Sequence, residues 1–185
     1  SENARIRHTA RRLIGELPKG SVTTVRIDRM LENAKADEHA EMLRLLAERG
    51  NPAGLPAARR ALRHDDETVR LAAIHAVGVL GGKDAVADLV PVLDKREPES
   101  PEHRAARSAL TRMGDDETTA EVVRAMKTAE PGLKAALLKV LSGRNAEAYV
   151  DAIFAVAEDQ EDQAVRVAVL NTLREVVDAE SLPRL

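Results

Sequence analysis

The chain has 185 residues with 28 basic and 31 acidic side chains, which gives a formal net charge of −3. This balance provides no long-range attraction to nucleic acid or to an anionic membrane, so neither is an expected partner. The absence of Cys excludes disulfides and thiolate metal sites. With one Phe, one Tyr and no Trp, the core must consist of Ala, Val, Leu and Ile, which is typical of packed helices.

Apolar residues recur at an almost constant interval along the chain. One series is separated by 31, 33, 31 and 32 residues: Leu46, Val77, Leu110, Leu141 and Leu173. A second series is separated by 31, 33 and 30 residues: Leu62, Leu93, Met126 and Val156. A fixed period of this length indicates a repeat array, in which each helical hairpin buries its apolar face against its neighbours.

The spacing predicts six units of two amphipathic helices each. The units cover about 3–35, 37–64, 65–96, 99–129, 130–160 and 161–185, with first helices near 3–16, 37–49, 67–81, 101–113, 132–142 and 164–177. In the third unit Asp65 and Asp66 supply N-cap oxygens, and Gly81-Gly82 ends the first helix. Since the register survives the prolyl segment 94–100, we expect one domain over residues 1–185.

Two segments carry a family resemblance. Residues 65–73 (DDETVRLAA) and 161–169 (EDQAVRVAV) resemble the HEAT repeat in its short bacterial, phycobilisome-lyase-like form. The resemblance covers residues 37–185 well. It implies an all-α fold, a right-handed α-α superhelix or solenoid of about five and a half hairpins, with first helices outside and second helices lining the concave face. That family includes scaffolds, a bilin lyase, a DNA glycosylase group and an iron hydroxylase, so the resemblance implies the fold more than the function.

A basic series follows the first helices. Its members are His39, Arg70, His103, Lys134 and Arg166, and each of the last four has an acidic residue four or five positions upstream. Charged pairs at helix starts satisfy free amides and complement the helix dipole. We therefore interpret Arg70, His103, Lys134 and Arg166 as a structural ladder that ties adjacent turns together, as the resemblance also suggests. The alternative is a basic stripe for phosphate.

A second charged series follows the second helices. Asp88, Glu121 and Asp151 occupy equivalent positions in consecutive units, where no capping rule demands an acid. A mixed series lies three residues further on, and within it Arg124 is expected to form an ordinary i,i+3 pair with Glu121. The candidate protein-binding residues on the concave face are Arg60, Asp88, Glu121, Arg124, Asp151 and Phe154. The alternative is a solvated, charge-balanced face that binds nothing.

Catalytic and metal sites are not expected. The five histidines lie on different helices without the i,i+3 or i,i+4 spacing that places two imidazoles on one helix face: His8, His39, His64, His75 and His103. The chain also lacks a glycine-rich phosphate loop, a serine elbow and aromatic walls for a base pocket. We expect no cofactor. No apolar stretch approaches the roughly 18 residues that span a bilayer, and a soluble, cytoplasmic protein is slightly favoured.

The leading hypothesis is a non-enzymatic scaffold that binds a protein or peptide along the concave face. A lyase-like or regulatory subunit acting on a partner protein is the first alternative, and a structural spacer is the second. The sixth unit begins a second helix at Leu182 and the chain stops at Leu185. Val169, Leu173 and Val176 are therefore expected to be partly uncovered, with further repeats or another domain beyond Leu185.

Overall fold

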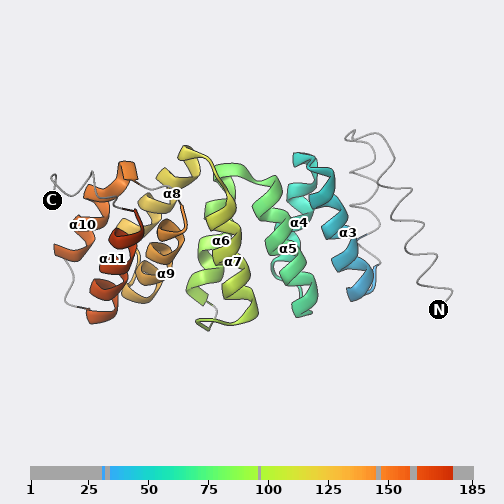
Figure 1. Ribbon diagram of the computed structural model, residues 1–185. Helices are drawn as coiled ribbons and strands as arrows, with labels where there is room; N and C mark the ends of the chain where they lie inside the picture. Colours follow the sequence, from blue (N-terminus) through green and yellow to red (C-terminus); the bar gives the residue numbers. More distant parts are fainter. Residues whose placement is uncertain (1–30, 32–33, 96, 145–146, 159–161, 177–185) are drawn as a thin grey trace. The chain divides into compact units, whose positions relative to one another are not determined.

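The computed structural model describes residues 31, 34–95, 97–144, 147–158 and 162–176. Within those residues the elements are α-helices and short 3-10 turns, without a strand, so the predicted all-α helical-repeat solenoid class is confirmed (Figure 1). The expected first unit near 3–35 and the expected second helix of the sixth unit lie almost wholly outside the described residues.

The chain forms two compact units, Ser1–Gly81 and Gly82–Leu185. In the first unit, α3 (Ala36–Arg49) and α5 (Glu67–Leu80) lie side by side, and α4 (Leu55–Ala61) packs against α5. The turn η1 (Pro52–Gly54) leads into α4. A Cβ atom on buried Gly54 would meet Leu46 at 3.2 Å and Leu80 at 3.3 Å, so α3 and the end of α5 close around this glycine. Continuity of both units as one domain stays a prediction.

At the start of α5, Asp66 is the N-cap, one of the two aspartates that the sequence offered for this role. The carboxylate of Asp66 accepts hydrogen bonds from the amides of Thr68 at 2.7 Å and Val69 at 3.4 Å. These two amides have no partner within the helix, so the aspartate satisfies them and sets the first residue of α5.

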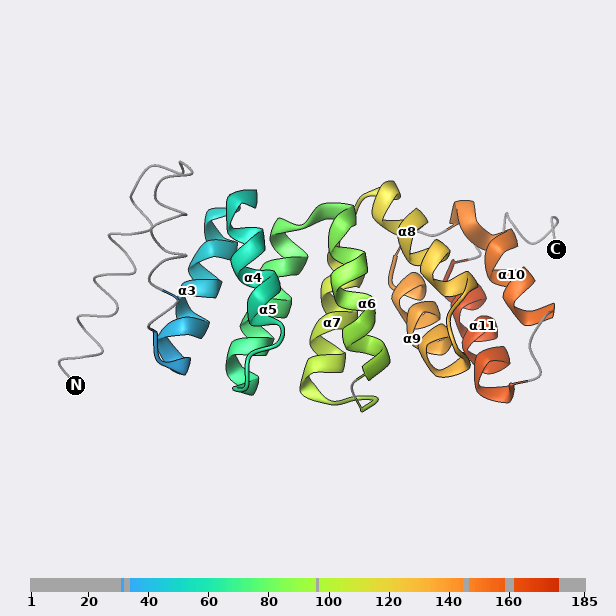
Figure 2. The ribbon, with the colours of Figure 1, turned by 180° about the vertical axis from the view of Figure 1, so that it is seen from behind.

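The second unit contains three helical pairs. The turn η2 (Gly82–Asp84) precedes α6 (Ala85–Lys95), and the helices α7 (Pro101–Arg112), α8 (Asp116–Lys127) and α9 (Pro131–Ser142) follow. The turn η3 (Glu147–Tyr149) leads into α10 (Val150–Glu158), and α11 (Gln163–Val176) completes the described part. The first helices α7, α9 and α11 pack in sequence, on the near side of this unit in Figure 1. The second helices α6, α8 and α10 are on the near side in Figure 2.

The predicted first helices from residue 37 onward agree with the observed ones to within one residue at each end. The agreement follows from the two apolar series, whose members are buried along the chain: Leu46, Val77, Leu110, Leu141 and Leu173, and Leu93, Met126 and Val156. Leu62, the first member of the second series, is only half-buried at the end of the short helix α4.

The predicted apolar edge on the last helix is wrong. Val169, Leu173 and Val176 are 1%, 7% and 4% exposed, because α11 packs against both α9 and α10. The apolar side chains that α11 does expose are Val167 and Leu170, at 50% and 68%, on its outer face. The error came from assigning the cover of this helix to a later hairpin, whereas the preceding one provides it.

Candidate functional site

We call the exposed side of α6, α8 and α10 in the second unit the second-helix face. Each helix contributes one acidic residue of the predicted series: Asp88 from α6, Glu121 from α8 and Asp151 from α10. Asp88 and Glu121 are half-buried, and Asp151 is exposed. The face therefore carries carboxylates at regular intervals, as the repeat register predicts.

Cations lie among these carboxylates. Nη1 of Arg124 donates to both carboxylate oxygens of Glu121, at 2.5 and 2.7 Å, which confirms the predicted i,i+3 pair. Nζ of Lys83, in η2, lies 3.0 Å from Oε2 of Glu117 in α8. The hydrogen bond with Glu117 raises the pKa of Lys83, and the charges of Glu117, Asp84 and Glu121 act in the same direction. The face is therefore of mixed charge around α8.

An aromatic ring stands beside the exposed carboxylate of α10. Ile153 and Val156 are buried in the core of the second unit, whereas Phe154 between them is half-buried. A ring in this state covers part of the core and offers part of its surface to a ligand, and such residues are frequent anchors in protein interfaces. Asp151 lies one turn earlier on the same helix.

Arg60 belongs to the first unit and is described there. It is exposed on α4, while Ala57, the equivalent of the acidic positions in this helix, is 3% exposed. The sequence of α4 contains no acid. The acidic series therefore begins at Asp88.

The basic series on the first helices departs from the predicted one at a single member, His103. In each of α5, α7, α9 and α11 one basic residue donates its amide to the carbonyl of the residue directly before the helix. These residues are Arg70, Arg104, Lys134 and Arg166, at distances of 3.1, 2.9, 2.8 and 3.1 Å. Arg104 thus occupies the position assigned to His103, which lies one residue earlier and is buried. The prediction failed because Ser100, the N-cap of α7, lies 10 residues before Leu110, whereas Asp66 and Glu130 lie 11 residues before Val77 and Leu141. A fixed apolar period cannot show that shift.

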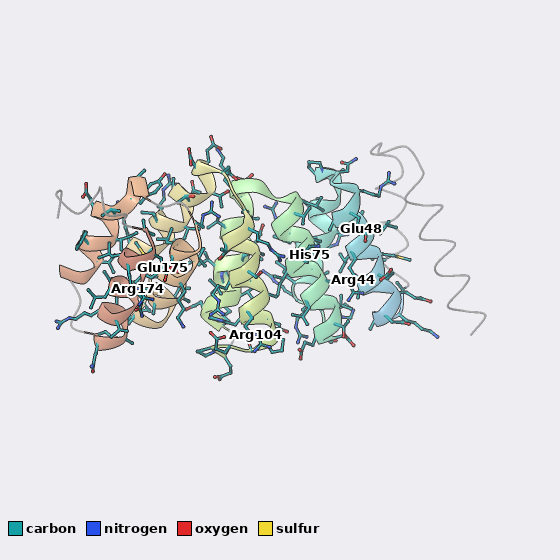
Figure 3. All side chains as sticks on the ribbon, in the orientation of Figure 1. Arg44, Glu48, His75, Arg104, Arg174 and Glu175 are labelled. Carbon is teal, nitrogen blue, oxygen red and sulfur yellow. The ribbon has the colours of Figure 1, made fainter. Side chains whose placement is uncertain are left out.

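Two guanidinium groups of this series, those of Arg70 and Arg104, donate to main-chain carbonyls. Nη1 of Arg70 donates to the carbonyls of His64 at 2.7 Å and Asp65 at 2.5 Å. Nη1 of Arg104, labelled at the start of α7 in Figure 3, donates to the carbonyl of Glu99 at 2.6 Å. Each of these two arginines therefore joins its helix to the preceding loop by hydrogen bonds. Lys134 is buried and Arg166 is exposed.

The loop residue Glu99 is held in a strained conformation. Its φ of 64° lies in the left-handed region that disfavours residues with a Cβ atom. Its carbonyl accepts from Arg104, and its carboxylate receives Nη1 of Arg107 at 2.6 Å and Nη2 at 3.3 Å. The hydrogen bond from Arg107 lowers the pKa of Glu99, so the ionised form is favoured.

A glycine at position 99 tests this strain. Both Glu99→Gly and Glu99→Ala lose the ion pair with Arg107, but only glycine adopts a φ of 64° without steric cost. We expect the melting temperature of Glu99→Ala to be about 2–4 °C below that of Glu99→Gly. Thermal unfolding followed by circular dichroism measures the difference. Equal melting temperatures for the two variants argue against strain at this residue.

His103 is a buried histidine of the second unit. It is 5% exposed, and its Nδ1 atom has no hydrogen-bond partner among the described residues. Burial lowers its pKa, the charges of Arg107 and Lys139 lower it further, and Glu99 acts in the opposite direction. The neutral form of the His103 imidazole is therefore favoured in its buried position on α7.

The most extensive polar contact in the second unit was not predicted from the sequence. Arg144, in the loop after α9, is 9% exposed and donates to the Leu110 carbonyl at 2.5 Å and the Asp115 carbonyl at 2.9 Å. Its Nε and Nη2 atoms also lie 3.0 and 2.8 Å from Oγ1 of Thr119. One side chain thus joins the end of α7, the N-cap of α8 and the first turns of α8. No spacing rule marks a loop arginine for this role.

The described residues hold neither a metal-binding cluster nor a membrane-spanning helix. Among the described residues no group of three or more His, Asp or Glu side chains is placed to hold a metal ion. None of the helices that the structure describes combines the length and apolar character needed to cross a bilayer.

Part of the chain matches a known family of repeats. Residues 23–111 match the family model for HEAT repeats. This match supports a HEAT-repeat protein, and HEAT repeats are generally protein-interaction scaffolds. No curated protein matches the chain. Among solved structures it is similar to an engineered protein, with 15% sequence identity over 91% of this chain and 89% of that one and a TM-score of 0.48.

Proposed function

We propose that this chain is a non-enzymatic scaffold that binds a protein or peptide along the second-helix face. The observation that carries the proposal is the half-buried ring of Phe154 beside the exposed carboxylate of Asp151. The HEAT-repeat match supports this class of function. Residues 65–73 and 161–169 support assignment to the short, phycobilisome-lyase-like form of the repeat.

The chemistry of this face favours a partner segment with both apolar and basic side chains. An apolar side chain of the partner covers the exposed part of Phe154, while basic side chains meet Asp88 and Asp151. The pair formed by Glu121 and Arg124 adds orientation, since a partner must match both signs of charge. Arg60, exposed on α4, is a candidate contact residue of the first unit by itself.

Two other functions are distinguished by experiment. A lyase-like or regulatory subunit acts on its partner and alters it chemically, whereas a scaffold returns it unchanged. A spacer binds nothing. Affinity capture followed by mass spectrometry of the captured partner separates these three outcomes.

Charge reversal tests the acidic residues of the face. We expect the triple variant Asp88→Lys, Glu121→Lys and Asp151→Lys to bind the captured partner at least about tenfold more weakly, because three attractive contacts become repulsive. Its melting temperature should stay within a few degrees of the parent chain, since substitutions on the solvent-facing surface usually change stability by about 0.5 kcal/mol or less, and a surface ion pair such as Glu121 with Arg124 contributes about 0–1 kcal/mol. Isothermal titration and thermal unfolding measure the two quantities.

A matched control carries the same change in net charge on the first helices. Glu48, Glu67 and Glu175 are exposed, and Glu48 and Glu175 are labelled in Figure 3. Their triple replacement by lysine should leave partner affinity unchanged. Equal loss of affinity in both triple variants indicates a general charge effect, and full affinity in the first indicates that the second-helix face is not the binding surface.

A further inference from the structure

Two imidazole rings meet in the first unit. The ring of His39, in the first turns of α3, lies edge-to-face against the ring of His64, in the loop between α4 and α5, with 5.0 Å between their centroids. Both residues are half-buried. This contact joins the start of α3 to a loop that is 25 residues further along the chain, as the two residue numbers show.

His64 is bonded as a neutral imidazole. Its Nδ1 atom accepts a hydrogen bond from the amide of Asp66 at 3.0 Å, and its carbonyl accepts from Arg70 at 2.7 Å. Nδ1 accepts only while it carries no proton, because a protonated imidazole has two donors and no acceptor. A proton at Nδ1 therefore breaks the bond to Asp66, which is the N-cap of α5.

The charged groups around the pair oppose protonation of His39. Burial lowers the pKa of His39, and the charges of His64 and of Arg60 in α4 lower it further. Asp66 lies close enough to His64 for the two charges to interact, but its carboxylate already accepts from the amides of Thr68 and Val69. Lys35, the N-cap of α3, accepts a hydrogen bond from the amide of His39 through its carbonyl, and Arg70 on α5 donates to the carbonyls of His64 and Asp65. Glu38, Arg63 and Asp65 are charged and directly flank the two histidines in the sequence.

From this geometry we infer that the contact between His39 and His64 is a proton-sensitive latch, in which proton uptake by the pair separates the start of α3 from the loop between α4 and α5. While the pair has taken up no additional proton, the edge-to-face contact and the bond from the Asp66 amide persist. At lower pH two cations face each other beside Arg60, and the acceptor at Nδ1 is lost. The stretch that opens contains α3, the first helix that the structure describes in this unit.

The sign of the pH dependence follows from linkage. A histidine whose folded pKa is below its ordinary value of 6.5 binds protons more readily in the unfolded or opened state. The contribution of His39 is therefore complete above pH 6.5 and is lost as the pH falls from there through the folded pKa. Histidine is the side chain suited to a switch in this range.

Two measurements on the intact chain test the latch. Histidine ring resonances are followed by NMR from pH 8 to 4.5, and protection factors of the α3 amides are measured by hydrogen exchange at pH 7.5 and 5.5. We expect His39 to titrate below 6.5, and His64→Gln to raise its titration midpoint. We expect protection in α3 to fall severalfold at pH 5.5 in the parent chain, and to fall little in His39→Gln.

His75→Gln is the matched control. His75 is exposed on α5 of the same unit and is labelled in Figure 3. Its replacement should preserve the pH-dependent loss of protection in α3. His103 lies in the second unit and is present in both the parent chain and His39→Gln, so its own titration does not enter the difference between them. The latch is refuted if His39 titrates independently of His64, or if protection in α3 does not change with pH.

Discussion

Arg144→Ala is expected to lower the free energy of unfolding of the second unit by about 3–5 kcal/mol. The side chain is 9% exposed and donates to the carbonyls of Leu110 and Asp115 and to the hydroxyl of Thr119. Truncation leaves the carbonyl of buried Leu110 without this donor, whereas the carbonyl of Asp115 keeps the Thr119 amide at 3.2 Å. Each unsatisfied group costs about 1–3 kcal/mol, and the vacated volume adds a packing loss.

Lysine at position 144 separates charge from geometry. Burial lowers the pKa of Arg144, while the charges of Asp115 and Asp116 favour its protonated form, so a cation is retained at this place. Lysine keeps the charge but offers a single point of donation in place of a planar fork. We expect Arg144→Lys to recover less than half of the stability that Arg144→Ala loses.

Urea unfolding followed by circular dichroism measures the Arg144 variants, and hydrogen exchange at α7 and α8 locates the loss. Arg112→Ala is the control, because Arg112 is exposed near the end of α7. It should change stability by about 0.5 kcal/mol or less. A loss of that small size in Arg144→Ala contradicts the assigned role.

Helix positions were predictable from the sequence because each depends on local residues and a fixed period. Two apolar series placed the first helices, and the side-chain oxygen of Asp66 defined where α5 begins. The binding of Arg144 to residues 25–34 positions earlier depends on how three elements meet in space. No periodic pattern in the sequence specifies these contacts, so the role of Arg144 could not be predicted.

The candidate site was predictable in part for the same reason. The repeat register assigned Asp88, Glu121 and Asp151 to successive second helices, and the i,i+3 spacing gave the pair of Glu121 with Arg124. The cation Lys83 was not foreseen, because it comes from a turn before α6 and reaches across to α8. His103 was misassigned because α7 begins one residue later, relative to its buried Leu110, than the other first helices do, and the apolar spacing does not show that shift.

Pro91→Ala is expected to stabilise the second unit by about 2 kcal/mol. Pro91 lies inside α6 on the exposed side of the helix, and proline has no amide to donate to the carbonyl of Ala87, four residues earlier. Proline inside a helix costs about 3 kcal/mol relative to alanine. Replacing proline by alanine raises the conformational entropy of the unfolded chain, which offsets up to about 1 kcal/mol of that gain.

Pro101→Ala is the matched control, with the opposite expected sign. Pro101 is also exposed, but it occupies the first position of α7, where an amide has no partner in the helix. Its replacement gains no hydrogen bond and only loosens the unfolded chain, so stability should fall by up to about 1 kcal/mol. Urea unfolding of the two variants measures both changes. A loss of stability in Pro91→Ala refutes this account of α6, because the ring must then contribute contacts that outweigh the missing hydrogen bond.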